Sequence, residues 1–291
     1  MKIVVLGSNG NIGIAIKLLS INIFKNYDFV FLNKKDVDIS NFNLLKKILE
    51  NHKPNFIINA SGYTKVDMAE NDKDNAYAAN VLGAKNLSIL SNELGSTLIH
   101  FSSDYVYDGN KKLPYNESDK KNPLSFYGET KHLGDLEIIK NCQKYIILRV
   151  SWVIDFIGNN FLTKIIEMGL KNNSLEIVND QFSRPTFSSD IANYIFKIID
   201  NKDIENKYGE YNLSSNGKII SRFDFVKTYY DSLSYIKKNT PKILPIPTSA
   251  FNNIAIRPMY TALDFSKFEN NFNLVLPDWQ MTLDKKNKIS I

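Results

Sequence analysis

Three side chains in the middle of the chain have the types and spacing needed for proton transfer. Tyr127 and Lys131 are four residues apart, so they share one face of a helix that begins near Ser125. A nearby ammonium group favours the phenolate form of a tyrosine and draws its pKa toward the working pH. The hydroxyl of Ser103 can hydrogen-bond the same substrate oxygen. These residues predict a proton donor for a carbonyl group, which needs a separate source of hydride.

The Tyr-x-x-x-Lys spacing alone is weak support, because a chain with 15 tyrosines produces it by chance. By itself it favours an amphipathic helix with the tyrosine at the core edge and the lysine in solvent. The neighbouring sequence favours a catalytic role for the pair instead. The apolar run 97–101 predicts a buried strand that leads into Ser102, Ser103 and Asp104. In open α/β sheets the ligand crevice lies outside the carboxyl ends of the strands, so we expect these side chains to face it.

The N-terminal residues have the pattern of a dinucleotide-binding turn. A strand at 2–6 leads into Gly7, Gly10 and Gly13, and an apolar helix follows at 14–19. The first glycine allows the tight turn, the second lets the backbone approach a pyrophosphate, and the third allows close packing of helix on strand. The helix N-terminus offers N–H groups and partial positive charge to the phosphates. The alternative is an ordinary strand–helix turn with an empty crevice.

The end of the second expected strand, at 27–32, bears on the choice of cofactor. Folds that prefer NAD usually place an acidic residue here, on the ribose 2′-hydroxyl. This chain has Asn33, Lys34 and Lys35 instead. Two cations can pair with a 2′-phosphate, so we expect NADPH rather than NADH. Alternatively, both lysines are simply exposed to solvent and bind no phosphate.

Strand and helix patterns alternate as far as residue 152, which predicts a doubly wound parallel sheet. The expected fold class is α/β: a Rossmann-like NAD(P)-binding domain over 1–152 and a smaller C-terminal α/β domain over 153–291 that mainly binds substrate. Part of 185–215 is expected to return to the first domain. The expected strands are 2–6, 27–32, 56–60, 97–101, 145–150 and 208–213, and the expected helices are 14–19, 41–52, 74–94, 125–141, 161–170, 191–199 and 222–233.

Polar residues on two of these helices carry more specific expectations. Asn80 lies within the helix expected at 74–94, where its amide is either buried and hydrogen-bonded or close to the active site. Ser189 and Asp190 precede the helix expected at 191–199. Both are residue types that cap helix N-termini, and we expect them to do so.

Composition excludes several classes of protein. The content of 43% hydrophobic and 23% charged residues is that of a soluble globular chain, and the net charge of +5 comes from scattered lysines, which suits an anionic small ligand better than nucleic acid. The single cysteine, Cys142, fits a reducing compartment. The three histidines lie far apart, so we expect no metal site. We find no membrane-spanning run and no leader pattern, and expect a cytoplasmic protein.

Together these motifs resemble the extended short-chain dehydrogenase/reductases and, within them, the dTDP-4-dehydrorhamnose reductase family. The resemblance covers nearly the whole chain. Besides the glycine turn it rests on the segments 59–70, 103–109, 122–131, 151–153, 179–182 and 257–258. It implies reduction of the 4-keto group of a nucleotide-linked 6-deoxy sugar by NADPH or NADH, in synthesis of a bacterial surface polysaccharide.

The resemblance also implies roles for individual residues. Tyr127 gives a proton to the carbonyl oxygen, Lys131 holds the nicotinamide ribose and lowers the tyrosine's pKa, and Ser103 tunes the tyrosine. Substrate contacts are expected from Ser103, Asp104, Tyr127 and Trp152 and, on weaker grounds, from Asn160, Gln181 and Arg257. Besides Tyr127 and Lys131, the residues expected at the cofactor are Gly7, Asn9, Gly10, Asn11, Ile12, Asn33, Lys34, Asp38, Ile39, Ala60, Gly62, Tyr63 and Thr64.

The chain departs from the family pattern at a few positions. Ser183-Arg184 stands where a glycine and a small residue are usual, and Met259-Tyr260-Thr261 replaces a run that usually contains Asn-Ser. Arg184 is either an added phosphate or base contact or a surface replacement. Ala15 stands where some members carry a glutamate used in metal-assisted dimerisation, so we expect no such metal. The sequence leaves open whether the protein forms a homodimer.

Other functions are compatible with parts of this pattern. The nucleotide can be GDP, CDP or UDP rather than dTDP, and an epimerase–reductase would need an additional general acid. A dehydratase would need a further acidic residue beside the catalytic hydroxyl, and Asp104 is the only one adjacent to Ser103. A non-catalytic nucleotide-binding subunit is the alternative outside enzymes. The presence of both Tyr127 and Lys131 weighs against it.

Overall fold

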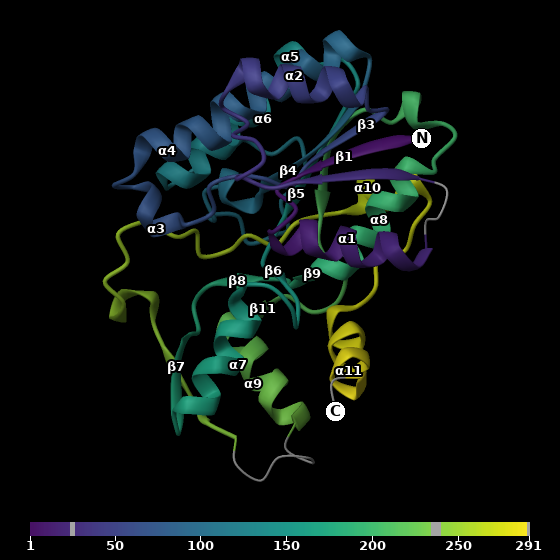
Figure 1. Cartoon of the computed structure of the whole chain (residues 1–291). Coiled ribbons are helices and arrows are strands. Elements are labelled where there is room, and N and C mark those ends of the chain that lie inside the picture. The colour runs from purple at the N-terminus through teal and green to yellow at the C-terminus, as the bar shows by residue number, and fades with distance from the viewer. Residues whose placement is uncertain (24–26, 234–239, 290–291) are drawn as a thin grey trace.

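A six-stranded parallel sheet forms the centre of the molecule (Figure 1). The computed structural model describes residues 1–23, 27–233 and 240–289. The sheet order is β10-β5-β4-β3-β1-β2, from β1 (Lys2–Leu6), β2 (Asp28–Leu32), β3 (Phe56–Asn59), β4 (Thr97–Ser103), β5 (Tyr145–Val150) and β10 (Gly209–Leu213). Every pair of neighbours is parallel. The α/β fold class with a doubly wound parallel sheet is confirmed.

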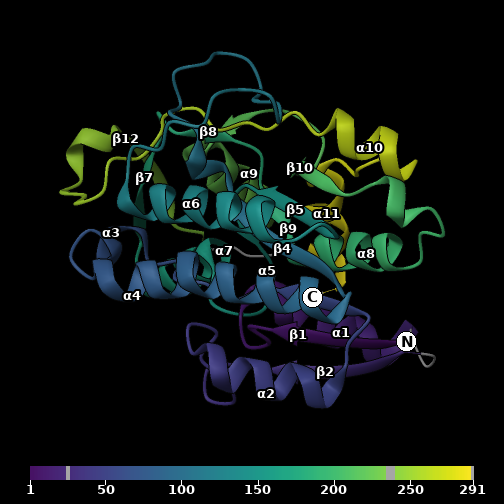
Figure 2. The same cartoon turned by 90° about the horizontal axis from the view of Figure 1, so that it is seen from above.

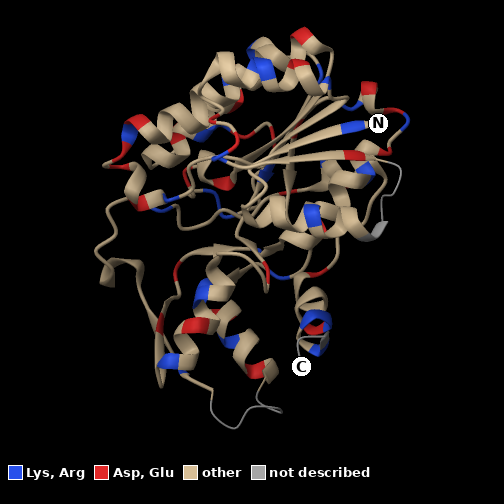
Figure 3. Ribbon diagram, in the orientation of Figure 1, with Lys and Arg blue, Asp and Glu red and all other residues tan. Residues whose placement is uncertain are grey.

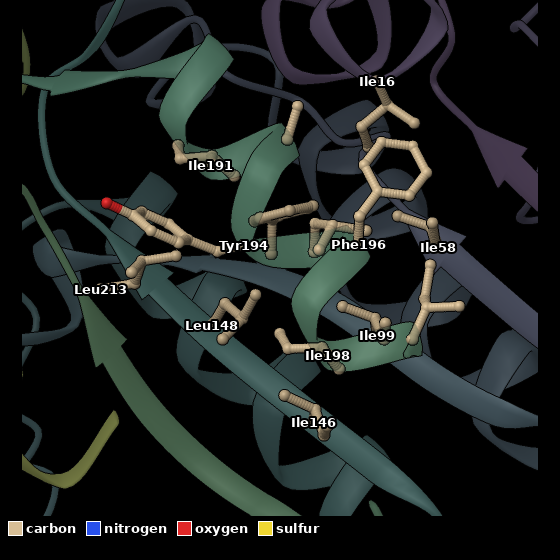
Figure 4. Close-up of a cluster of buried hydrophobic side chains, with 14 of the residues drawn as sticks. Ile16, Ile58, Ile99, Ile146, Leu148, Ile191, Tyr194, Phe196, Ile198 and Leu213 are labelled. Carbon is tan, nitrogen blue, oxygen red and sulfur yellow. The ribbon is translucent and has the colours of Figure 1, made fainter. Parts of the chain in front are cut away.

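Helices cover both faces of the sheet, which explains why its central strands are apolar on both sides. One face carries α2 (Phe42–His52), α5 (Gly83–Leu94) and α6 (Phe126–Asn141), which lie in a row in Figure 2. The other face carries α1 (Asn11–Ile23) and α8 (Ser188–Ile199). Figure 4 shows Phe196 and Ile198 of α8 against Ile58, Ile99 and Leu148 of the strands.

The order of the strands reverses around β1, so the carboxyl ends of β1 and β3 flank the crevice where such sheets bind ligands. Gly7 follows β1 with a φ of 78°, and a Cβ there would lie 2.5 Å from the backbone of Ala60. At Gly13 a Cβ would lie 2.3 Å from the carbonyl oxygen of Gly7. Larger side chains at either position would push the turn out of the crevice. The glycine spacing therefore keeps this turn closely packed.

Two expectations about helices need correction. The helix expected at 74–94 contains a π-helical turn, Ala78–Leu82, between α4 (Lys73–Tyr77) and α5. The helix expected at 191–199 begins earlier, at Ser188, and its N-cap residue, Phe187, makes no capping side-chain hydrogen bond. The hydroxyl of Ser188 and the N–H of Ser189 instead each donate to the carboxylate of Asp155 at 3.0 Å. A carboxylate distant in sequence thus does what Ser189 and Asp190 were expected to do.

The C-terminal part of the chain has a second core. It is built mainly from α7 (Phe161–Lys171), α9 (Arg222–Leu233), the parallel pair β7 (Ser174–Val178) and β12 (Lys242–Ile246), and α11 (Trp279–Ile289). Phe225 and Trp279 pack edge to face in it, with ring centroids 5.9 Å apart. The strand β10 and the helix α10 (Ser266–Phe272) return to the first core. A domain boundary at residue 152 stays a prediction.

Short elements connect these parts. They are α3 (Val66–Ala69), β6 (Val153–Ile154), β8 (Phe182–Ser183), β9 (Thr186–Phe187), β11 (Ile220–Ser221) and single turns at Asp104–Val106, Ile204–Asn206 and Thr248–Ala250. Figure 3 shows charges of both signs interspersed on the outer helices. In the part of the chain that the structure describes, no helix is long and apolar enough to span a membrane.

Candidate active site

A cavity of about 760 Å³ opens at the carboxyl ends of β1, β3 and β4. Every residue that the sequence assigned to the cofactor lines it, from the glycine turn through Asn33, Lys34, Asp38 and Ile39 to the stretch 60–64. Ser103, Asp104 and Trp152 line the same cavity. The structure therefore brings the glycine turn and the proton-transfer residues to one hollow, of the size that small-molecule ligands occupy.

The helix α6 presents Tyr127 and Lys131 to this cavity. Ser125 caps it by accepting a hydrogen bond from the N–H of Gly128 at 3.2 Å. The N–H of Phe126 donates to the carboxylate of Glu70 at 2.8 Å. Two of the N–H groups that a helix start leaves unpaired are thus satisfied, which fixes the first turn of the helix and, with it, Tyr127.

The electrostatic setting of Tyr127 differs from the expectation. Burial is the largest influence and raises the pKa of its phenol above the ordinary value, while the Ser103 hydroxyl lowers it and Asp104 raises it. Lys131 is not among the largest influences on this pKa. Its ammonium donates to the carbonyl oxygen of Phe101 at 2.7 Å. In this arrangement Tyr127 is a protonated phenol, as a proton donor must be.

Lys131 is itself strongly perturbed. It is 5% exposed, and burial lowers the pKa of its amine to about 8, an effect that the charge of Asp135 partly offsets. A buried ammonium loses hydration, so the neutral form gains. The amine of Lys131 therefore changes charge just above neutral pH, unlike an exposed lysine.

Asn80 satisfies both alternatives that the sequence left open. It is 2% exposed and also lines the cavity. Its carbonyl oxygen accepts from the N–H of Tyr63 at 2.8 Å, and its amide donates to the carbonyl of Tyr63 at 3.1 Å and to the hydroxyl of Thr130 at 3.0 Å. Asn80 sits in the π-helical turn, a feature common at functional sites. It fastens the loop after β3 to the helix that carries Tyr127.

Asp104 ends a buried chain of hydroxyl groups. Its carboxyl lies 2.7 Å from the hydroxyl of Ser151, which lies 2.6 Å from that of Ser183, and the latter is 3.1 Å from the carbonyl oxygen of Thr261. Asp104 is 3% exposed, and burial raises its pKa. The departures from the family pattern at Ser183 and Thr261 therefore support the acidic residue beside Ser103.

Trp152 lines the cavity, and Arg222, from the C-terminal core, packs against its ring. Trp152 has a φ of 41°, a strained value for a bulky residue of the kind often found at functional sites. The guanidinium of Arg222 lies 4.4 Å from the centre of the Trp152 ring and 4.9 Å from that of Phe161. Its Nε donates to the side-chain oxygen of Gln181 at 3.1 Å. Sequence reasoning missed Arg222, since no local motif marks it.

The three weaker substrate candidates lie outside the cavity lining. Asn160 caps α7: its oxygen accepts from the N–H of Thr163 at 3.3 Å, and its amide donates to the carbonyl of Ile157 at 2.9 Å. Gln181 is 4% exposed beside Arg222. The structure thus gives Asn160 a helix-capping role and leaves its contact with substrate without geometric support.

Two further arginines, Arg184 and Arg257, behave differently from each other. Arg257 forms an ion pair with Asp67, near Arg222. Arg184 donates to the carbonyl oxygens of Gly217 at 2.8 Å and Leu263 at 3.0 Å. It is therefore a bridge between backbone segments, neither a surface replacement nor a group turned to a ligand.

Within the described ranges, no three His, Cys, Asp or Glu side chains are grouped so as to hold a metal ion. The cavity does fit a dinucleotide: glycine and alanine at 7, 60 and 62 leave space beside the sheet ends, and the first turn of α1 faces the hollow through Asn11 and Ile12. A parallel sheet with this cavity, a tyrosine and lysine on one helix and a serine at a strand end defines the class of NAD(P)-dependent short-chain dehydrogenase/reductases.

Comparison with known proteins agrees. The RmlD substrate binding domain family matches residues 1–288. A dTDP-4-dehydrorhamnose reductase of Aggregatibacter actinomycetemcomitans is 32% identical over 286 residues, covering 97% of both chains. A solved structure of a dTDP-4-dehydrorhamnose reductase from Clostridium acetobutylicum has a TM-score of 0.92 at 32% identity over 100% of each chain. One from Bacillus anthracis, in complex with NADP, has a TM-score of 0.89 at 32% identity over 98% of this chain and 97% of that one.

The chain therefore belongs to the RmlD substrate binding domain family, and the family resemblance seen in the sequence is confirmed.

Proposed function

We propose that this protein reduces the 4-keto group of dTDP-4-dehydrorhamnose with NADPH, in the synthesis of a bacterial surface polysaccharide. The observation that carries the proposal is the shared cavity: Tyr127, Lys131 and Ser103 line the hollow that the glycine turn also lines. Two relatives covering nearly the whole chain, one of them solved with NADP, are named dTDP-4-dehydrorhamnose reductases.

The residues divide the proton chemistry of such a reduction among them. Bound NADPH supplies a hydride to the carbonyl carbon. Tyr127 gives its phenolic proton to the carbonyl oxygen, so the carbonyl becomes an alcohol and the tyrosine is left as a phenolate. The ammonium of Lys131 stabilises that phenolate, and the hydroxyl of Ser103 hydrogen-bonds the reacting oxygen. Burial keeps the phenol protonated until the substrate draws the proton away.

Cofactor contacts follow from the cavity lining. The glycine turn and the start of α1 would hold the pyrophosphate, Asp38 and Ile39 would lie along the adenosine, and Gly62 to Thr64 would lie along the nicotinamide half. Lys34 and Lys35 line the cavity at the end of β2. This position favours NADPH, because the 2′-phosphate of that cofactor would lie near both cations.

Substrate contacts would come from the opposite side of the cavity. Asp104 and Trp152 would bind the sugar, and Arg222 with Arg257 would supply positive charge for the diphosphate. We also place the protein in the cytoplasm, which its single buried cysteine favours. The homodimer that the sequence left open stays a prediction.

The test is NADPH and NADH oxidation by the purified protein against 4-keto-6-deoxy sugars linked to dTDP, GDP, CDP and UDP. Turnover of dTDP-4-dehydrorhamnose without substrate epimerisation supports the proposal. Turnover confined to another nucleotide would move the substrate assignment, and a second stereocentre changed in the product would indicate an epimerase–reductase. Cofactor binding with no turnover on the whole panel would indicate a binding subunit.

A further inference from the structure

A buried polar cluster lies behind Lys131, on the side away from the cavity. His100, on β4, is 1% exposed, and its Nε2 lies 3.5 Å from the Nζ of Lys131. Asn59, the last residue of β3, is the register partner of His100. Neither residue lines the cavity. His100 can therefore act on the reaction through its contact with Lys131, which does line the cavity.

Hydrogen-bond donors fix the state of this histidine. The backbone N–H of Ser61 donates to the side-chain oxygen of Asn59 at 3.1 Å, and a backbone N–H has no acceptor role, so the orientation of the amide is determined. The amide nitrogen of Asn59 then lies 2.9 Å from the Nδ1 of His100. That nitrogen donates, so Nδ1 must accept. His100 is consequently a neutral imidazole with its hydrogen on Nε2.

The Nε2 of His100 faces two groups on α6. One is the Nζ of Lys131, and the other is the Oδ1 of Asp135 at 4.0 Å. That Oδ1 is buried and has no hydrogen-bond partner among the described residues. The Oδ2 of Asp135 is held by Ser102 at 2.8 Å and by Arg149 at 3.0 Å. The carboxylate is thus fixed, and the Nε2 of His100 faces both this carboxylate and the amine of Lys131.

We propose that His100 is a positioning residue for Lys131: Asn59 locks it as the neutral Nε2–H tautomer, and this N–H disfavours the ammonium form of Lys131 while confining Nζ to the carbonyl of Phe101. The proposal rests on the proposed function, because it assigns Lys131 to that reaction. A tautomer with a bare Nε2 would instead accept a hydrogen bond from the ammonium and stabilise the charge.

Other charged groups near this cluster also influence the protonation of His100 and Lys131. Burial, Lys131 and Arg149 hold the pKa of His100 well below its ordinary value, so the imidazole stays neutral. The titratable and charged groups facing the cluster from the packed elements are Tyr127, Lys131, His132 and Asp135 on α6, Arg149 on β5, Glu210 on β10 and Lys121 in the preceding loop. All of them remain in place in the variants Asn59→Leu and His100→Gln below, and only the assignment variant His132→Gln removes one.

The tautomer can be measured directly by nitrogen NMR on protein carrying isotope-labelled histidine. The chain has three histidines, and the variants His52→Gln and His132→Gln assign the signals by elimination. We expect the Nε2–H pattern for His100, unchanged between about pH 5.5 and 9, where a free imidazole would titrate. In Asn59→Leu the lock is absent and we expect the Nδ1–H form to appear. A titrating His100, or the Nδ1–H form in the wild type, would overturn the proposal.

The functional consequence is read from pH profiles. In His100→Gln the amide can turn its oxygen to the ammonium, so we expect the basic limb of sugar reduction and of NADPH binding to move up by about one pH unit. His52→Gln, on the surface helix α2, is the matched control and should leave both limbs in place. An unmoved limb in an active His100→Gln would overturn the proposal.

The two proposals fail separately. Absence of sugar reduction in the wild type would remove the proposed function, but the tautomer and the pH dependence of NADPH binding would still test His100. Normal sugar reduction with an Nδ1–H histidine would remove the role of His100 and leave the proposed function standing.

Discussion

The amine of Lys131 donates a hydrogen bond to the carbonyl oxygen of Phe101 at 2.7 Å, joining the helix that carries Tyr127 to the strand that leads to Ser103. The contact lies at the wall of the cavity. It holds two separate catalytic elements at one point, which is the kind of support that a preorganised site needs. It also explains why Lys131 is buried, and therefore why its pKa falls to about 8.

A first prediction is that sugar reduction loses rate above about pH 8. As the pH rises through the pKa of Lys131 the ammonium loses its proton, and the phenolate formed from Tyr127 is no longer stabilised. Tyr127 does not set this limb, because its own pKa is raised. The measurement is kcat/KM for the sugar between about pH 6 and 10. Full rate persisting to the top of this range would contradict the assignment, and Lys131→Met should be slow and lack the limb.

A second prediction concerns the proton donor. Tyr127→Phe removes the phenolic proton and keeps the ring, so we expect kcat to fall by about 10²–10⁴-fold while NADPH still binds. Tyr145→Phe is the matched control, because Tyr145 begins β5 at the end remote from the crevice. Steady-state rates and a fluorescence titration of NADPH separate the two effects. A phenylalanine variant that keeps near-normal turnover would exclude Tyr127 as the donor.

A third prediction addresses the choice of cofactor. Lys34 lines the cavity at the end of β2. Replacing it with alanine removes a cation from the expected 2′-phosphate position at the surface, worth about 1 kcal/mol, so KM for NADPH should rise roughly fivefold. KM for NADH should not change. Lys47→Ala, on the exposed face of α2, should alter neither value. Equal losses for both cofactors would show that Lys34 does not read the 2′-phosphate.

Local signals in the sequence were enough to bring the expected catalytic and cofactor residues to one cavity. The glycine spacing, the small residues after β3 and the Tyr127–Lys131 spacing each depend on a few consecutive positions, and the sheet brings their strand ends together by its topology. The substrate side was harder, because its residues come from distant segments. Arg222 meets Trp152 only through the packing of α9, and no spacing within the sequence encodes that contact.

Structural hydrogen bonds explain two further differences between the predictions and the structure. The start of α8 was misplaced because its cap, Asp155, lies 33 residues before Ser188. Asn160 was assigned to substrate although its amide is used to cap α7. The partner of Ser188 is distant and the sequence does not reveal it, whereas Asn160 directly precedes an expected helix, which is the position of an N-cap residue.

A fourth prediction uses the single cysteine as a probe of folding. Cys142 is 4% exposed, and burial raises the pKa of its thiol to about 11. Thiolate is the reactive form, so the native protein should react with a thiol reagent far more slowly than the unfolded chain. The rate measured against denaturant should follow the loss of helical circular dichroism. Rapid labelling of the native protein would contradict the burial of Cys142.

A fifth prediction tests the substrate side with two arginines of different function. Arg222 lies between the rings of Trp152 and Phe161, beside Gln181, whereas Arg184 donates to backbone carbonyls. Arg222→Met should raise KM for the nucleotide sugar by about 10–100-fold, as expected when a charged hydrogen bond of about 1.5–3 kcal/mol is lost, and should leave NADPH binding unchanged. Arg184→Met should lower the melting temperature instead. Both changes remove a partly buried guanidinium. A loss of substrate affinity confined to Arg222→Met would therefore come from the position of Arg222 and not from the loss of a buried charge as such. If Arg222→Met changed only stability, the diphosphate would have to bind elsewhere.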